Sequence, residues 1–437
     1  MKHLARFGFI LLLAAGCSNA NNPVSFSDVI GHGASGGFSD YKIIPIGSFN
    51  TQYNIRSMDI NEQGTVVGFG IAQYFVESSF IWTLEDGFQT IPTPPGYKWF
   101  QALSINDNGV IGGTAFNSYN EHFPALLTPE GDLVIVQEDM NDGILWDVNN
   151  SNQAAVWAGG RAFFWSESSA AIEIEGAISA TDINDAGQVL GEIDVTVDGL
   201  VYRYGYIWSR DAGIDTLTDL HWWGMMGDIN NPGDVVGQMT FPSGDRHGFI
   251  RRADGTITDL GTVEGGWYSE AMAVNDYGVV VGKSLLADYS AVPFVWSPET
   301  GMVALPTMDG NPAEAWAINN SGVIAGNAIG PDNNKYACVW IISEGPQTPE
   351  EHVTTAIDLV NDLLSDGILA TNQAKPLIGK LETALEKLVN ENIRGAIGSL
   401  NAAVNQVYAL INAGSLTEAQ AAPLLEMLTA TITLLNG

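Results

Sequence analysis

The sequence predicts an all-β seven-bladed propeller followed by a small all-α four-helix bundle. Three observations lead to this prediction. One hairpin pattern occurs seven times, the N-terminal region supplies a strand that the last copy lacks, and apolar residues take helical spacing near the C-terminus. The clearest copy runs from Ala180 to Gly191: an apolar strand ends in Asn184, Gly187 closes a turn, and a second apolar strand follows, as in a β-hairpin.

The Asn of this pattern marks the period of the repeat. It stands at Asn61, Asn106, Asn149, Asn184, Asn230, Asn275 and Asn319. Most intervals are about 45 residues, which is the length of a propeller blade and too long for leucine-rich or ankyrin units. The third copy is shorter and has Asn152 and Val156 where the pattern has Gly. We therefore expect its blade to be degenerate.

Each copy continues with two further strands. An aromatic-apolar-Trp strand such as Phe80–Trp82 comes first, and a Gly-containing turn leads to a short fourth strand such as Thr256–Leu260. Four antiparallel strands make one propeller blade.

The two ends of the array predict a closed ring. The seventh copy stops after its third strand, because Ile341–Pro346 leads into a linker. Lys42–Gly47 matches the fourth strand at Val303–Met308 and precedes the first hairpin. An N-terminal strand that completes the last blade would remove the open sheet edges, so we expect a propeller over residues 41–343.

These units resemble the HAF-type extracellular repeats of bacterial secreted proteins, whose pattern runs alanine, Asp-Ile-Asn-Asp, Gly, Val-Val-Gly, His-Ala-Phe and Trp. The resemblance covers the seven units, although the His-Ala-Phe element survives only partly, as His247-Gly248-Phe249. It implies an exported repeat protein without a well-established common activity. It supplies no catalytic residue.

The composition bounds the class of partner. Of 437 residues, 46% are hydrophobic and 15% are charged, so the chain can bury a sizeable core. Fifty acidic residues face 17 basic ones, which gives a formal net charge of -33. Such a charge repels polyanions, and nucleic acid is therefore not expected as a partner.

Residues 1–17 predict a lipoprotein signal peptide. A basic start and an apolar stretch lead to Leu13–Cys17, which resembles a bacterial lipobox with Cys17 as the lipidated residue. Ordinary cleavage after Ala20 is the competing interpretation. By resemblance to Gram-negative lipoproteins, Ser18 after the Cys implies an outer-membrane lipoprotein, anchored in that membrane and facing the periplasm or the cell surface. Residues 18–40 are expected to form a flexible tether.

The second cysteine, Cys338, has no partner for an intramolecular disulfide. It occupies the slot that holds an aromatic residue in other copies, such as Phe80. We expect it to be a small buried apolar residue rather than a nucleophile.

Large aromatic residues mark the connections between blades. They are Tyr53, Trp99, Trp222, Trp223, Trp267 and Tyr268. Flat side chains beside connections of variable length describe a recognition rim, and aromatic faces suit sugar rings. The candidate ligand is thus a polysaccharide or a protein. The alternative is that these rings wedge between neighbouring blades.

Signals for metal binding and catalysis are sparse. Asp59, Asp147, Asp182 and Asp228 stand two residues before the repeat Asn and could hold Ca²⁺ around a central channel, or bond their own turns. No cofactor is expected, and neither a nucleophile elbow nor a phosphate-binding loop occurs. The leading hypothesis is a non-enzymatic binding protein. The alternatives are a polysaccharide-degrading hydrolase or lyase with carboxylates at the channel mouth, and a structural protein of surface assembly.

Residues 344–349 are expected to be a linker, and residues 350–437 a helical module. Thr348–Glu351 reads as a capping box that opens the first helix. The pattern from Ile357 to Gly367 recurs from Val404 to Gly414, which predicts two duplicated helical hairpins. The module is similar to the FIMAH type appended to secreted polysaccharide-degrading enzymes. A spacer or docking role is expected for it.

Overall fold

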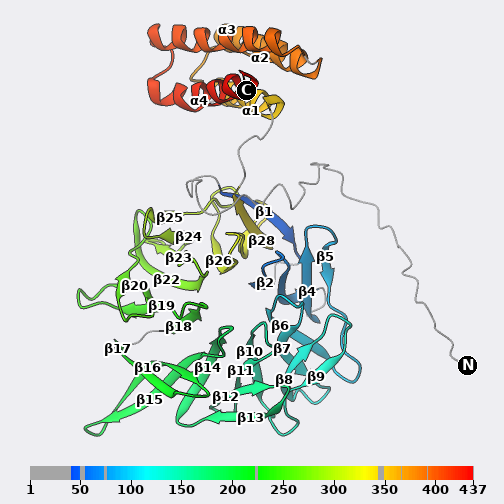
Figure 1. Ribbon diagram of the computed structural model, residues 1–437, viewed down its shortest axis with the longest axis vertical. Coiled ribbons are helices and arrows are strands. Elements are labelled where there is room, and N and C mark those ends of the chain that lie inside the picture. Colours follow the sequence, from blue (N-terminus) through cyan, green and yellow to red (C-terminus); the bar gives the residue numbers. More distant parts are fainter. Residues whose placement is uncertain are drawn as a thin grey trace, which may run out of the picture. The chain divides into compact units, whose positions relative to one another are not determined.

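A computed structural model describes residues 41–49, 55–72, 76–221, 225–342, 349–365, 367–390 and 392–436. The predicted signal peptide, the tether, Tyr53, Trp222, Trp223 and most of the predicted linker lie outside these ranges. The described chain forms two compact units, one of strands up to Ile341 and one of helices after it (Figure 1).

Small antiparallel sheets build the first unit. Four of them follow one another along the chain, and each has four strands. The first sheet is β2 (Ile55–Ile60), β3 (Val66–Ala72), β4 (Val76–Thr83) and β5 (Gly87–Thr90), and the second is β6 (Trp99–Ile105), β7 (Ile111–Phe116), β8 (His122–Leu127) and β9 (Leu133–Ile135). The third is β10 (Gly143–Val148), β11 (Ala154–Ala158), β12 (Arg161–Ser166) and β13 (Ser169–Ile174), and the fourth is β14 (Ala177–Ile183), β15 (Val189–Val197), β16 (Leu200–Ser209) and β17 (Gly213–His221). Figure 1 shows the sheets set around a common centre, with the first strand of each innermost.

The next sheet has eight strands in two runs of four. The first run is β18 (Met225–Ile229), β19 (Val235–Thr240), β20 (Arg246–Arg251) and β21 (Ile257–Asp259), and the second is β22 (Gly266–Val274), β23 (Val280–Leu286), β24 (Ala291–Ser297) and β25 (Gly301–Ala304). A single parallel pair, Arg246 with Tyr268, joins the two runs. Apart from this pair, each run repeats the four-stranded order of the other sheets.

The N-terminal strand completes the last sheet, as the sequence predicted. Its order is β1 (Tyr41–Gly47), β28 (Lys335–Ile342), β27 (Ile324–Ile329) and β26 (Ala313–Ile318). Ile44 and Ile46 pack in one hydrophobic cluster with Phe80 of β4 and Val339 of β28. The last sheet is thereby joined to the first.

The inner turns explain the repeated Asn and the Gly three residues later. In the copy at Asn184, the Gly187 amide donates to the Asn184 carbonyl at 2.9 Å, and the Asn184 Oδ1 accepts the Gln188 amide at 3.0 Å. Gly187 has a φ of 72°, which favours glycine. In the third copy Asn152 takes this conformation with a φ of 56°, as Asn tolerates.

The expectation of a degenerate third blade was wrong. Strands β10–β13 form a complete four-stranded sheet. Asn152 replaces the turn glycine, and Val156 pairs with Phe163 within a buried cluster. The shorter interval therefore shortens the connections and leaves the strand pairing intact.

Packing explains why the second strand of most repeats contains a glycine. A Cβ at Gly282 would lie 2.0 Å from the Glu270 carbonyl oxygen and 2.9 Å from the Phe294 ring. The glycine thus lets a buried aromatic ring of the third strand lie against the inner strands. Cys338 is fully buried in the corresponding slot of β28, as predicted, and burial raises the pKa of its thiol.

The second unit consists of α1 (Pro349–Ser365), α2 (Thr371–Val389), α3 (Ile393–Asn412) and α4 (Glu418–Asn436). All four contribute to one hydrophobic cluster, through residues such as Val353, Leu381, Leu400 and Leu428. Gly367 and Gly414 follow α1 and α3 with φ values of 71° and 70°. In the described ranges, no helix is long and apolar enough to cross a membrane.

Candidate functional site

A closed ring of asparagine side chains lies at the centre of the sheet unit, at the end of each innermost strand. Each Asn Nδ2 donates to the backbone carbonyl of the next Asn at 2.9–3.2 Å, in the order Asn61, Asn106, Asn149, Asn184, Asn230, Asn275, Asn319 and back to Asn61. All seven residues are buried. The turn residue that the sequence singled out thus also ties each sheet to its neighbour.

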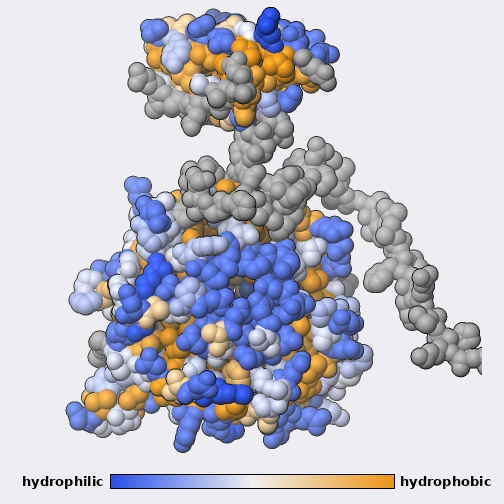
Figure 2. Space-filling model, in the orientation of Figure 1, coloured by the Kyte–Doolittle hydropathy of each residue, from blue (hydrophilic) through white to orange (hydrophobic). Residues whose placement is uncertain are grey.

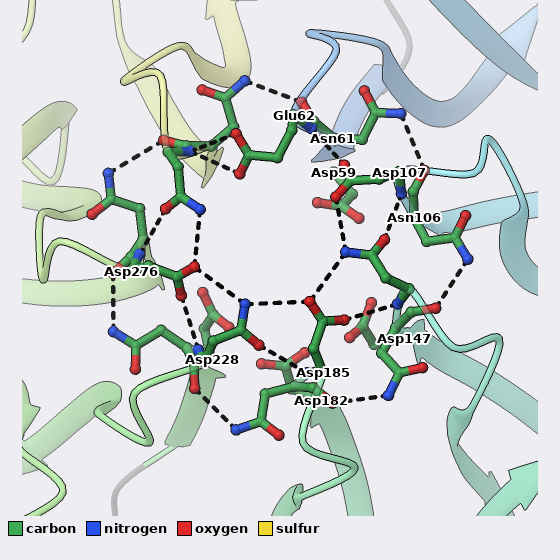
Figure 3. A pocket seen from close by; sticks show the side chains of 18 of the residues that line it. Asp59, Asn61, Glu62, Asn106, Asp107, Asp147, Asp182, Asp185, Asp228 and Asp276 are labelled. Atoms are coloured by element: carbon green, nitrogen blue, oxygen red, sulfur yellow. Dashed lines mark hydrogen bonds between the residues drawn. The ribbon is translucent and has the colours of Figure 1, made fainter. Parts of the chain in front are cut away.

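The residues that follow these asparagines make a second closed ring, drawn in Figure 3. They are Glu62, Asp107, Asn150, Asp185, Asn231, Asp276 and Asn320, and each backbone amide donates to the side chain of the next at 2.8–3.0 Å. We call the two rings together the Asn/Asp ring. Figure 2 shows hydrophilic residues gathered over the middle of the sheets.

Acids and amides alternate around most of this second ring. The Asn150 Nδ2 donates to Asp107 at 2.8 Å and to Asp185 at 3.1 Å, so one amide holds two carboxylates. The Asn231 Nδ2 bridges Asp185 and Asp276 in the same way. The Asn320 Nδ2 donates to Asp276, while Glu62 accepts the Asn320 backbone amide. Because seven is odd, strict alternation fails once, where Asp107 follows Glu62 without an amide side chain between them. Alternation limits the repulsion that seven adjacent carboxylates would produce.

Four aspartates lie deeper in the channel. Asp59, Asp147, Asp182 and Asp228 each accept a backbone amide from the next sheet, for example Ile105 to Asp59 at 2.8 Å and Ile229 to Asp182 at 2.6 Å. Ser104, Ala273 and Ala317 occupy the slot elsewhere. The predicted alternative, a bond to the aspartate's own turn, is confirmed for Asp59 and Asp182, whose Oδ1 atoms accept the amide of the next residue at 2.7 and 2.9 Å. The bonds to the next sheet were not predicted.

Burial raises the pKa of all four deep aspartates. The pKa of Asp59 rises to about 7, by burial first and then by the charge of Asp147. Burial and the neighbouring Asp228 raise the pKa of Asp182 well above its ordinary value. The Asp182 carboxyl is hydrogen-bonded to the carboxyls of Asp147 and Asp228, and these contacts contribute to the raised pKa values of Asp147 and Asp182 after burial. Within the described ranges, no group of three or more His, Cys, Asp or Glu side chains is placed to hold a metal ion.

The predicted rim residues fall into different environments. Trp99 is only 7% exposed, and its ring stacks on Phe116 with centroids 4.5 Å apart. Phe116 in turn stacks on His122. The Trp99 ring also contacts Phe69 of β3 in the neighbouring sheet, with centroids 6.5 Å apart. Trp99 therefore packs between two sheets, which is the wedge arrangement that the sequence left open.

Trp267 differs because it is 45% exposed at the start of β22. Its Nε1 donates to the Leu286 carbonyl at 3.0 Å, which fixes the indole in one orientation. Tyr268 lies beside it with ring centroids 5.7 Å apart and is partly buried. Sequence reasoning missed Tyr289, which is 72% exposed and meets Trp267 edge-on at 5.6 Å. The sequence did offer one signal for Tyr289: it lies in a connection between the second and third strands of its repeat, where the variable loops were expected.

The chain matches no protein-family model and no curated protein. It is similar to the beta-propeller domain of the Trilobed protease from Pyrococcus furiosus, at 12% identity over 58% of this chain and 81% of that one, with a TM-score of 0.41. TolB from Acinetobacter baumannii is 9% identical over 70% and 80% of the two chains, with a TM-score of 0.35. The BP39L lectin from Burkholderia pseudomallei is 10% identical over 66% and 95%, with a TM-score of 0.41. These neighbours are propeller proteins, in keeping with the small antiparallel sheets, and such distant likeness says nothing about function.

Proposed function

We propose that this protein is an exported, non-enzymatic glycan-binding protein of the HAF-repeat type, anchored in the outer membrane through a lipid on Cys17. Its sheet unit would be a seven-bladed propeller, and its helical unit a four-helix bundle that serves as a spacer or docking module. The two seven-membered circuits of the Asn/Asp ring support the blade count. The signal-like N-terminus supports export and anchoring.

The observation that carries the binding proposal is the state of Trp267. Its indole is held by a backbone hydrogen bond, yet nearly half of the residue remains exposed. Tyr289 stands against it as a second exposed ring. Aromatic rings that are already ordered lose little conformational entropy when a flat sugar ring stacks on them.

The deep aspartates support a non-enzymatic role over the hydrolase alternative. Each of them already accepts a backbone amide, and three of them contact one another. A general acid or nucleophile must instead reach the substrate directly. In this proposal the carboxylates stabilise the scaffold.

The test uses the mature protein, purified in detergent from cells that express the full chain. Retention on immobilised neutral and acidic polysaccharides is measured for the wild type, Trp267→Ala and Tyr277→Ala, while released sugar is assayed in the supernatant. Tyr277 is the matched control, because it is 73% exposed and lies just beyond the opposite end of β22. We expect Trp267→Ala to weaken retention at least tenfold, as loss of a stacking ring does.

Three outcomes would contradict the proposal. Equal retention of wild type and Trp267→Ala would remove the aromatic site. Release of reducing or unsaturated sugar ends would favour the enzyme. Purification of the mature protein without a lipid on Cys17 would contradict the anchor.

A further inference from the structure

A line of aromatic and cationic side chains continues from Trp267 across neighbouring sheets. The Arg246 guanidinium lies 5.5 Å above the Tyr268 ring, and the Tyr268 hydroxyl donates to Glu270 at 3.4 Å. Glu270 also lies 3.5 Å from the Lys283 Nζ. These contacts connect β20, β22 and β23.

The line extends to the last and first sheets. The Lys283 Nζ donates to Glu314 of β26 at 3.2 Å and lies 5.5 Å from the centre of the Trp316 ring. Arg56 of β2 contacts the same ring at 5.6 Å. We call these residues, together with Lys335 of β28, the cationic seam. Its members are Arg246, Tyr268, Glu270, Lys283, Glu314, Trp316, Arg56 and Lys335.

Basic residues outnumber acidic ones in the cationic seam, whereas acidic residues outnumber basic ones in the whole chain. The seam contains four basic residues and two carboxylates, Glu270 and Glu314, whereas the chain has a net charge of -33. Both carboxylates pair with Lys283, and in the described structure no carboxylate lies within 4.0 Å of Arg56, Lys335 or Arg246. Elsewhere, Arg161, Arg203, Arg251 and Arg252 each have an acidic partner, whereas Arg210 and Lys98 have none among the described residues.

Lys335 is a half-buried cation of the seam that lies near other cations. Burial lowers the pKa of its ammonium group, and the nearby charges of Arg56 and Lys283 lower it further, against the opposing effect of Glu314. An anion placed among these three cations would relieve their mutual repulsion.

Unpaired hydrogen-bond donors accompany the seam. Three buried nitrogen atoms have no hydrogen-bond acceptor in the described part of the chain: Trp316 Nε1, Gln238 Nε2 and Asn327 Nδ2. Gln238 and Asn327 are 1% and 0% exposed. The Gln238 Oε1 accepts from Arg246 at 3.2 Å, and the Asn327 Oδ1 accepts from the amide of Ser57, next to Arg56. The Ser57 Oγ, beside Asn327, is also buried without a partner. Buried donors are normally paired, and here the unpaired N–H donors outnumber the unpaired acceptors.

We propose that the cationic seam is a carboxylate-binding subsite, which selects a short oligosaccharide containing a uronic acid residue. This inference rests on the proposed glycan-binding function, because it places the neutral part of the ligand on Trp267. Guanidinium and ammonium groups bind carboxylates through charge-assisted hydrogen bonds. A short ligand fits better than a long polyanion. At 0.1 M salt the acidic residues more than about 10 Å from the seam are screened from a short ligand. An extended polyanion would lie directly against those acidic residues and be repelled.

The test compares trigalacturonate with its fully methyl-esterified form by titration calorimetry, using the mature full-length protein. The two probes share their sugar rings and differ in charge. We expect the acid form to bind at least tenfold more tightly at 50 mM NaCl, with the difference shrinking at 500 mM. Arg56→Gln and, separately, Lys335→Gln should each remove most of this preference.

Arg210→Gln is the matched control. The Arg210 guanidinium also lies over an aromatic ring, 5.2 Å from the centre of Phe164, but on a different part of the sheet unit. Its loss should leave both affinities unchanged. Thermal melting of each variant checks that the fold is retained.

The outcomes separate the two proposals. Equal affinity for the acid and the ester, unchanged in Arg56→Gln, would overturn the seam as a carboxylate site while the glycan-binding proposal stands. Binding of neither probe would overturn the seam, and Trp267-dependent retention on neutral polysaccharide would then still support glycan binding. Failure of both assays would overturn both.

Discussion

The Asn/Asp ring and the cationic seam illustrate two ways in which a repeat protein uses polar residues. The ring draws two equivalent residues from each of seven copies, and its carbonyl, amide and carboxylate groups bond one another in a closed circuit. The seam involves only four neighbouring units, and its donors exceed its acceptors. Polar groups that are mutually satisfied stabilise a scaffold, whereas a surplus of one kind marks a place for a ligand.

The largest effect is expected from breaking the ring at Asn230. In Asn230→Ala, the Asn275 carbonyl loses its donor at 2.9 Å, and the Asp234 amide loses its acceptor at 2.7 Å. Both groups are buried, so we expect a loss of about 2–4 kcal/mol in the free energy of unfolding, measured by urea denaturation.

Asn334→Ala is the control for this variant. The Asn334 side chain bonds Asp332 in an exposed turn, and its loss should cost about 0.5 kcal/mol or less. Equal effects of the two variants would show that the ring is no more than a set of independent turns.

A smaller effect is expected from the pH dependence of the deep aspartates. Their raised pKa values mean that the folded state binds more protons than the unfolded state between the ordinary value of 3.8 and about 7. Stability from these groups is therefore greatest at low pH and falls as the pH rises through that window. Urea midpoints should decline from pH 5 to pH 8.

Asp182→Asn tests the cause of this decline. The variant removes one titrating group from the three in contact, so its midpoints should change less with pH, and we expect it to be about 1–2 kcal/mol more stable than wild type at pH 8. A wild-type midpoint that rises from pH 5 to pH 8 would contradict the assignment.

The smallest effect concerns the alternation of acids and amides. Asn150→Asp would replace the donor between Asp107 and Asp185 with a third carboxylate. The site is exposed, so we expect a loss of about 0.5–1 kcal/mol that diminishes in 1 M NaCl. A loss that does not depend on salt would show that hydrogen-bond geometry, rather than charge, governs the alternation.

Much of the scaffold could be predicted from the sequence because its reasons are local. Asn184 and Gly187 specify a turn within four residues, and the match between Lys42–Gly47 and Val303–Met308 predicted the closing strand. The degenerate third blade was predicted wrongly, since Asn152 can adopt the turn conformation that Gly has elsewhere.

The candidate sites were less accessible to sequence reasoning. Trp99 and Trp267 occupy similar places in their repeats, but one is stacked under Phe116 and the other is exposed. Trp99 is covered by Phe69 of β3 and Phe116 of β7, and such contacts between strands cannot be read from the repeat pattern. The seam residues Arg56, Lys335 and Trp316 are far apart in the sequence and occupy no common slot, so no period could reveal them.

By itself, the sequence determined the small antiparallel sheets, the inner turns and the closing strand, because a hydrogen-bonded turn and an apolar strand depend on residues close together in the chain. Only the tertiary structure decided which aromatic rings are exposed and which charges meet. Those outcomes depend on contacts between sheets, where Arg56, Lys283 and Trp316 approach one another from three separate strands.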